Sequence, residues 1–211
     1  MTDFFDFFFA QFKDYTPLFL TLELSAIFFG LLSVIYSAKN SILVYPTGLA
    51  STFIFVYILY TADLYGDLII NAYYFYMSVY GWFLWSRKDR ENHDLLKISS
   101  VTAKENKKCL AIFIVSVIFV ALVYHFFDMF NQWWAYVDTF ITGLFFIGMW
   151  LLAKRKIENW LYLIAGDIIA IPLFFYKGLI FTGFFYIVLT IIAIFGYLSW
   201  KKTLQSEALL Q

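Results

Sequence analysis

The amino-acid sequence repeats itself at a spacing of 115 residues. Five pairs of identical or similar residues mark the repeat: Glu23 and Asp138, Ala38 and Ala153, Lys39 and Lys154, Gly81 and Gly196, and Trp85 and Trp200. The segments 80–85 and 195–200 both place aromatic residues around a glycine, and basic residues follow each of them closely. Self-similarity over this distance indicates a duplicated folding unit, so we expect the chain to fold as two related halves.

The composition places both halves in a membrane. Hydrophobic residues make up 63% of the chain and charged residues only 14%, with a mean hydropathy of +0.76, whereas soluble domains carry about 25% charged residues. A spanning helix needs roughly 20 mostly apolar residues. We therefore expect seven spans, at about 17–37, 42–61, 65–86, 108–127, 134–153, 157–176 and 179–200.

The basic residues orient these spans. Seven spans put the two termini on opposite sides of the membrane, and loop lysines and arginines collect on the cytoplasmic side. Of the 15 basic residues, only Lys13 and Lys177 fall on one predicted side, and all the others fall on the opposite side. We therefore orient the protein with its N terminus outside and its C terminus in the cytoplasm.

The repeat spacing covers four predicted spans, an even number, so the two copies point the same way through the bilayer. The chain, 1–211, then forms a single all-α membrane domain with a 3+1+3 parallel-repeat arrangement. Residues 17–86 form the first three-helix repeat, 87–133 a cytoplasmic linker with an unpaired fourth helix, and 134–202 the second three-helix repeat. Two similar bundles around a solute are typical of transporters.

One ionisable side chain lies near the middle of a predicted span. Asp167 is about ten residues from either end of the segment 158–176. A carboxylate at that depth costs roughly 2.5–3.5 kcal/mol on insertion scales, so it must face protein or water. It either bonds a neighbouring helix in its protonated form or, as we favour, attracts a cationic solute into a midplane cavity.

Polar side chains on the third span are candidates for the wall of the same cavity. Asn71 and Tyr74 stand three residues apart and therefore share one helical face. Tyr186 takes the place of Asn71 in the second copy. Such a difference is what a pseudo-symmetric pocket adapted to an asymmetric solute requires. Asp67 lies nearer the outer end, and we interpret it as a cap or a helix contact.

Tryptophan and tyrosine also collect at membrane interfaces without binding any ligand. Trp85 and Trp200 adjoin basic residues, and we interpret both as interface residues. Trp160 and its repeat partner Tyr45 fit either an interface belt or a pocket wall. In a pocket, such rings would stack on a flat aromatic solute, and their faces would stabilise a cation.

Several classes of function lack their motifs. The sequence holds no glycine-rich phosphate loop, GxSxG or HExxH motif, so we expect no catalytic residue, no cofactor and no ATP-driven pump. His125 has no cysteine, histidine or carboxylate at ligand spacing, which argues against a metal site. Cys109 is the single cysteine and is expected to serve in packing. The formal net charge of zero gives no indication of a nucleic-acid partner.

Four segments together resemble the PnuC family of bacterial vitamin transporters: YGD at 65–67, NAYY at 71–74, YGWFLW at 80–85 and KIENW at 156–160. The likeness continues through Lys177, Gly178, Tyr186 and Gly196, and it covers about 23–202. The resemblance implies a seven-helix fold similar to that of the sugar-transporting SWEET proteins. It also implies a homotrimer in the bacterial cytoplasmic membrane, with one pathway through each protomer.

The resemblance further implies a function. Members of the family import an unphosphorylated vitamin precursor by facilitated diffusion with alternating access, and a separate cytoplasmic kinase traps the product. The type substrate is nicotinamide riboside. The family's pocket lies between the two three-helix bundles, and its motif positions fall on Asn71, Tyr74 and Trp160 of this chain.

Two positions depart from the family pattern. Leu163 stands where the family usually has a second tryptophan, and Asp167 stands where it often has asparagine. An added anion suits a ring with a fixed positive charge, which both nicotinamide riboside and thiamine carry. Thiamine-transporting relatives are known within this family, so both vitamins stay open, with nicotinamide riboside as the family default.

An intramembrane aspartyl protease is the alternative from a different class, because two membrane aspartates could act as acid and base. Its motifs are incomplete here: a glycine separates Tyr65 from Asp67, and the segment IAGD at 164–167 lacks the first glycine of GxGD. A retinal-type receptor is poorer still, because no lysine lies between Leu179 and Ser199 to form a Schiff base.

Overall fold

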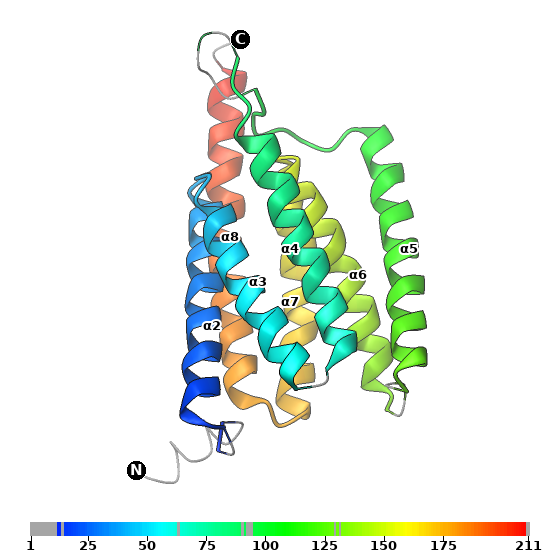
Figure 1. Cartoon of the computed structure of the whole chain (residues 1–211). Helices are drawn as coiled ribbons and strands as arrows, with labels where there is room; N and C mark the ends of the chain where they lie inside the picture. Colours follow the sequence, from blue (N-terminus) through cyan, green and yellow to red (C-terminus); the bar gives the residue numbers. More distant parts are fainter. Residues whose placement is uncertain are drawn as a thin grey trace.

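The structure, a computed structural model, describes residues 12–13, 15–62, 64–89, 91, 95–128, 130 and 132–209 (Figure 1). These residues form seven α-helices: α2 Pro17–Ala38, α3 Val44–Thr61, α4 Tyr65–Trp85, α5 Ala103–Phe126, α6 Trp134–Ala153, α7 Asn159–Tyr176 and α8 Ile180–Ala208. Outside the helices, Ser99 and Lys156 form an isolated β-bridge. The all-helical prediction is confirmed.

Six of the helices are long and apolar enough to cross a membrane by length and composition. The helix α4 is not among the six, although it has 21 residues. Asp67, Asn71 and several tyrosines lower its hydropathy, and these are the polar groups expected on a cavity wall. The membrane-spanning character of the other six predicted segments agrees with the hydropathy of the helices found there.

The repeat found in the sequence is also present in the backbone. The helix α3 covers residues 44–61 and α7 covers 159–176, so both ends of α7 lie 115 residues after those of α3. The helices α4 and α8 begin at 65 and 180, and α2 and α6 end at 38 and 153. All three helices of the first half therefore have a counterpart at the same spacing in the second half.

The turns between these helices repeat as well. Asn40 has a φ of 53° in the α2–α3 turn, and Arg155 has a φ of 51° at the equivalent position in the α6–α7 turn. Leu64 and Leu179, which precede α4 and α8, have φ values of −88° and −87°. Because left-handed backbone is unusual for residues other than glycine, its occurrence at both equivalent positions indicates a common local fold.

Six helices pack as a closed ring. The helix α3 packs between α2 and α4, and α7 packs between α6 and α8. Contacts of α2 with α8 and of α4 with α6 join the two halves, and these two contacts are equivalent under the repeat. The helix α5 lies outside the ring, mainly against α6 (Figure 1).

The linker between the halves packs onto the α6–α7 turn. The Ser99 amide donates to the Arg155 carbonyl at 3.1 Å, and the Ile157 amide donates to the Ser99 carbonyl at 3.0 Å. The Val101 amide donates to the Glu158 carboxylate at 3.0 Å. The segment 95–102 thus belongs structurally to the second half, although it follows the first half in the chain.

The start of α5 differs from the prediction. The apolar run suggested a helix from about 108, but α5 begins at Ala103, because Thr102 and Glu105 form a capping box. The Glu105 amide donates to the Thr102 hydroxyl at 3.3 Å, and the Thr102 amide donates to the Glu105 carboxylate at 2.9 Å. These bonds satisfy helix-end amides, so the polar turn 103–107 becomes helical before the apolar run begins.

We predict that Thr102→Ala lowers the free energy of unfolding by about 1 kcal/mol, because it removes the side-chain acceptor for the Glu105 amide. Equilibrium unfolding in mixed detergent–SDS micelles measures the loss. Thr102→Ser keeps the hydroxyl and should retain most of the stability. An equal loss in both variants would contradict a role for the cap.

Candidate functional site

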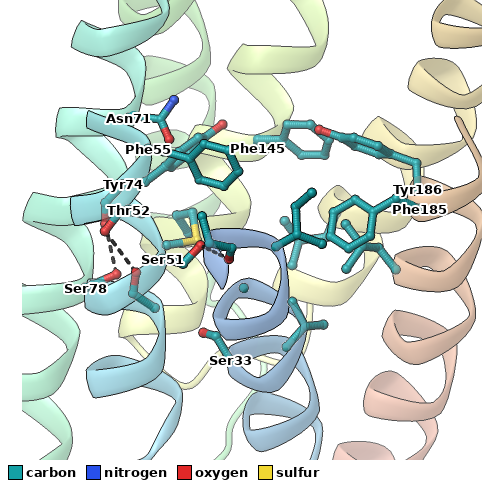
Figure 2. A pocket seen from close by; sticks show the side chains of 18 of the residues that line it. Ser33, Ser51, Thr52, Phe55, Asn71, Tyr74, Ser78, Phe145, Phe185 and Tyr186 are labelled. Atoms are coloured by element: carbon teal, nitrogen blue, oxygen red, sulfur yellow. Dashed lines mark hydrogen bonds between the residues drawn. The ribbon is translucent and has the colours of Figure 1, made fainter. Parts of the chain in front are cut away.

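A central cavity of about 280 Å³ lies inside the ring, and all six ring helices contribute to its wall (Figure 2). Its size is near the lower end of the roughly 300–1,000 Å³ range of small-molecule pockets. The lining residues are Ala26, Ile27, Gly30, Ser33, Val34, Gly48, Ser51, Thr52, Phe55, Asn71, Tyr74, Ser78, Phe145, Met149, Leu163, Asp167, Phe185, Tyr186 and Leu189.

The cavity wall follows the repeat. Many lining residues form pairs at the 115-residue spacing, with both members in contact with the cavity: Gly30 and Phe145, Val34 and Met149, Gly48 and Leu163, Thr52 and Asp167, Asn71 and Tyr186, and Tyr74 and Leu189. Equivalent backbone positions of the two halves therefore face one another across one space. The side chains at these positions differ, so the symmetric frame encloses an asymmetric chemical surface.

Asp167 is the one acidic residue among the described residues of the cavity wall. Its side chain comes from the middle of α7 and is 5% exposed. Among the described residues that line the cavity, it is the only aspartate, glutamate, lysine, arginine or histidine. Its repeat partner in the first half is Thr52, a neutral hydroxyl. The cavity thus holds one carboxylate without a basic residue in its wall, which favours a solute that brings a positive charge.

Asn71, Tyr74 and Tyr186 line the same cavity, as the sequence predicted. The Asn71 amide group donates to the Asp67 carbonyl one turn earlier at 3.1 Å. The Tyr186 ring lies 4.9 Å from the Phe174 ring and 6.2 Å from the Phe145 ring, in a nearly parallel arrangement with the latter. Figure 2 shows Asn71 and Tyr74 on one side and Tyr186 on the facing side.

Sequence reasoning missed a group of cavity hydroxyls. Ser33 donates to the Val44 carbonyl and Ser51 to the Ala26 carbonyl, both at 2.7 Å, and Ser78 donates to the Tyr74 carbonyl at 2.9 Å. Because each hydroxyl proton goes to a backbone carbonyl, the oxygens are oriented as acceptors. Thr52 could have been found as the repeat partner of Asp167, but single serines in apolar helices give no comparable signal.

A second cavity has a volume of about 340 Å³ and lies on the side where α4 and α8 begin; we name it the outer cavity after the orientation predicted from the basic residues. Its wall includes Asp67 and the ion pair between the Lys177 ammonium and the Asp138 carboxylate. Four side chains line both the outer and the central cavity: Asn71, Tyr74, Phe145 and Tyr186. These four side chains therefore separate the two spaces, and the outer cavity leads toward the central one.

The structure places Trp160 and Tyr45 elsewhere. Neither residue is part of the central cavity wall; their side chains are 1% and 2% exposed and pack with Trp85 and Trp200. We call these four side chains the aromatic layer. The prediction that Trp160 and Tyr45 contact a solute directly is not supported by this placement, because each ring packs against a helix of its own half: Tyr45 against Gly81 of α4, and Trp160 against Gly196 of α8.

The assignment of Trp85 and Trp200 to the membrane interface is wrong. Trp85 is 1% exposed and Trp200 is fully buried. The Trp200 indole donates to the Ser37 carbonyl at 3.0 Å, and the Arg155 guanidinium lies 4.0 Å from the centre of the Trp85 ring. A tryptophan beside basic residues looks the same in sequence whether it faces lipid headgroups or packs beneath an arginine.

Comparison with known proteins identifies the family. Residues 20–202 match the sequence family described as Nicotinamide mononucleotide transporter. The chain belongs to this family, which is the PnuC family that its motifs resemble. It is 26% identical over 197 residues to the nicotinamide riboside transporter PnuC of Escherichia coli, with 81% of each chain covered. It is 23% identical over 172 residues to the riboflavin/roseoflavin transporter RibM of Streptomyces davaonensis, covering 81% of this chain and 80% of RibM.

The fold also matches a solved structure. The crystal structure of the vitamin B3 transporter PnuC superposes with a TM-score of 0.67 at 21% identity, covering 94% of this chain and 86% of the other. The protein is thus a multi-pass membrane transporter with the PnuC fold, and its relatives are transporters rather than enzymes.

The aspartyl protease alternative is wrong. Besides the family membership, the two aspartates lie in different spaces: Asp167 lines the central cavity and Asp67 lines the outer cavity. An acid and base pair must act on the same bond, which this separation does not allow.

We predict that Lys177→Met lowers the free energy of unfolding by about 1–2 kcal/mol, because it leaves the Asp138 carboxylate, whose side chain is 20% exposed, without its ammonium partner. Adding Asp138→Asn should restore part of the loss, with a coupling of about 1 kcal/mol in a double-mutant cycle. Detergent–SDS unfolding measures all three variants.

Lys201→Met is the matched control, because the Lys201 ammonium lies 5.9 Å from the Tyr197 ring at an exposed position. Its effect should stay below about 0.5 kcal/mol. Strictly additive losses for Lys177 and Asp138 would show that the ion pair contributes nothing.

Proposed function

We propose that the protein imports an unphosphorylated aromatic vitamin precursor that carries a positive charge, with nicotinamide riboside as the principal substrate. The observation that carries the proposal is the single carboxylate, Asp167, in an otherwise uncharged cavity that both halves enclose. The name of the Escherichia coli relative supports the same solute.

The chemistry of the cavity suits each part of this solute. Asp167 supplies the counter-charge for a pyridinium ring, and desolvation inside the cavity strengthens that attraction. The rings of Phe145, Phe185 and Tyr186 offer flat faces for stacking. The Asn71 amide and the oriented serine oxygens suit a carboxamide and ribose hydroxyls.

Thiamine is the alternative, and two lining residues are compatible with it. Asp167 pairs as well with a thiazolium as with a pyridinium, and Leu163 leaves an aliphatic surface where the family usually has a tryptophan. Riboflavin, named for the Streptomyces relative, carries no fixed positive charge and would gain nothing from Asp167. We therefore rank nicotinamide riboside first, thiamine second and riboflavin third.

Transport would proceed by alternating access in a SWEET-like 3+1+3 arrangement of parallel repeats. In this arrangement the helices α2, α3 and α4 form one bundle and α6, α7 and α8 the other, while α5 returns the chain across the bilayer. Rocking of one bundle against the other would open the cavity to each side in turn. We propose facilitated diffusion, with a cytoplasmic vitamin kinase that phosphorylates the product and so keeps it inside.

The orientation and assembly follow the same reasoning. The ends of α2, α4, α6 and α8 gather most of the basic residues, so this end would face the cytoplasm, with the N terminus outside, in a bacterial inner membrane. A homotrimer is the assembly that the family resemblance implies. The apolar side chains exposed on α5, among them Leu110, Ile114, Ile118 and Leu122, suit lipid or a neighbouring protomer.

We predict that Asp167→Asn weakens binding of nicotinamide riboside about tenfold or more, because it removes the counter-charge of the pyridinium. The reduced dihydro form of the same riboside has an uncharged ring and should lose less than about threefold. Isothermal titration of the purified protein with both compounds measures the difference, and thiamine is titrated in parallel to rank the two vitamins.

Asp67→Asn is the matched control, because it removes one carboxylate from the outer cavity and leaves the central cavity unchanged. It should weaken nicotinamide riboside much less than Asp167→Asn does. Equal losses for the charged and the uncharged riboside in Asp167→Asn would refute the electrostatic role.

We further predict counterflow in proteoliposomes that hold unlabelled nicotinamide riboside and no ion gradient. Labelled vitamin should accumulate transiently, and ionophores should leave the rate unchanged. Gly48→Leu should abolish the flux, because its side chain would fill the cavity; even its Cβ would meet the Ser33 hydroxyl at 3.0 Å. Uptake that requires a sodium or proton gradient would rule out facilitated diffusion.

A further inference from the structure

The aromatic layer lies between the central cavity and a third, polar cavity of about 470 Å³ at the basic end of the bundle. The aromatic layer belongs to a larger buried cluster. Val34, Met149 and Leu163 line the central cavity and also pack against this cluster. On the other side, Ile98 of the linker belongs to the cluster and Leu96 packs against it, and both line the polar cavity. A solute that passed from one cavity to the other would have to part these rings.

Each half of the protein contributes two rings to the layer. Tyr45 and Trp85 meet edge to face, with centroids 5.2 Å apart at 88°, and Trp160 and Trp200 repeat this geometry at 5.6 Å and 87°. Trp85 and Trp200 then join the halves, at 6.1 Å. The four rings form one continuous barrier across the ring of helices, built twice by the same repeat.

Two glycines at equivalent positions, Gly81 and Gly196, leave room for the Tyr45 and Trp160 rings of the layer. A Cβ at Gly196 would lie 2.6 Å from the Trp160 ring, and a Cβ at Gly81 would lie 2.6 Å from the Tyr45 hydroxyl. Any larger residue at either position would push the ring out of the layer. The geometry that the two halves share therefore includes the glycine contacts that hold these rings in the barrier.

Two contacts hold the halves together at the layer. The Trp200 indole of α8 donates to the Ser37 carbonyl of α2 at 3.0 Å. The Arg155 guanidinium, from the α6–α7 turn, lies 4.0 Å from the centre of the Trp85 ring of α4. Arg155 also donates to the Leu96 carbonyl, and Ser99 donates back to the Arg155 carbonyl, so the linker positions the guanidinium. The equivalent residue in the first half is Asn40, so this contact exists on one side only.

The layer is closed but incompletely hydrogen-bonded. The Tyr45 hydroxyl and the indole N–H groups of Trp85 and Trp160 are buried and make no hydrogen bond within the described part of the chain. A buried polar group without a partner costs free energy that exposure to water recovers. Hydration of these three groups would therefore offset part of the free-energy cost of opening the layer. Such an offset suits a barrier that must open and close.

We propose that the aromatic layer is the gate that closes the central cavity toward the cytoplasm, and that Arg155 is a positioning residue that latches this gate through Trp85. The inference rests on the proposed function for its direction. When the bundles rock, Tyr45 and Trp85 move with one half, and Trp160 and Trp200 move with the other. Arg155 then releases Trp85.

The test measures access to the cavity floor from each side. Met149→Cys in a Cys109→Ala background places one thiol in the wall of the central cavity. A membrane-impermeant maleimide is applied to either face of oriented vesicles, and Ser206→Cys, exposed near the end of α8, identifies the face on the side of the layer. Arg155→Gln and Trp200→Phe each remove one contact between the halves.

We expect both variants to raise the labelling rate of the Met149→Cys thiol about fivefold from the Ser206 face, the ratio that corresponds to a lost cation–π contact or buried hydrogen bond. Labelling from the opposite face should stay unchanged. Lys154→Gln is the matched control, because the neighbouring Lys154 ammonium lies over the Tyr80 ring, outside the layer. Its labelling rate should equal that of the parent.

Unchanged labelling from the Ser206 face in both variants, or an increase from the opposite face, would overturn the gate. If one variant does not fold, the other decides, because each substitution removes a different bond: Arg155 over the Trp85 ring, or the Trp200 indole to the Ser37 carbonyl. The readout needs no vitamin. Faster labelling together with absent vitamin binding would therefore refute the proposed substrate and leave the gate standing, whereas vitamin counterflow with unchanged labelling would refute the gate alone.

Discussion

The structure depends on keeping the polar inner faces of two three-helix halves away from lipid. An unshielded carboxylate at the bilayer centre costs roughly 2.5–3.5 kcal/mol on insertion scales, and Asp167 is 5% exposed inside the ring. Neither half encloses the central cavity alone, because the ring closes only where α2 meets α8 and α4 meets α6. The central cavity and the aromatic layer both take residues from the two halves, so both follow from this closure.

Duplication gives the two halves the same backbone, and the few residues that differ between them give the cavity its chemistry. Equivalent turns keep the same backbone, with φ values of 53° at Asn40 and 51° at Arg155. Some side chains at equivalent positions differ. Thr52 of the first half and Asp167 of the second both line the central cavity. Arg155 of the second half contacts the Trp85 ring, whereas its equivalent Asn40 makes no contact of this kind. A symmetric cavity could not orient a solute with one charged end, so these differences give the site its direction.

Sequence reasoning found the helices and part of the cavity because both leave a local signal. Apolar runs between basic turns mark the spans, and a lone polar residue inside such a run marks an inward face, as Asp167, Asn71, Tyr74 and Tyr186 illustrate. It failed for Trp85, Trp200, Trp160 and Tyr45, because an indole or phenol near a helix end fits an interface belt, a pocket or a buried contact equally well. It also missed Ser33, Ser51 and Ser78, whose hydroxyls are directed by carbonyls of their own or neighbouring helices.

Composition, repeat spacing and motifs identify the chain as a duplicated, all-helical membrane protein of the nicotinamide mononucleotide transporter family, with one carboxyl group deep in its second half. Composition and repeat spacing are local or periodic properties, so they can be read along the chain. The packing of the helices, in contrast, shows which aromatic rings line the central cavity and which form the aromatic layer. It also shows that the linker segment 95–102 positions Arg155 over Trp85. Those contacts join residues far apart in the chain, and only the packing of one half against the other brings them together.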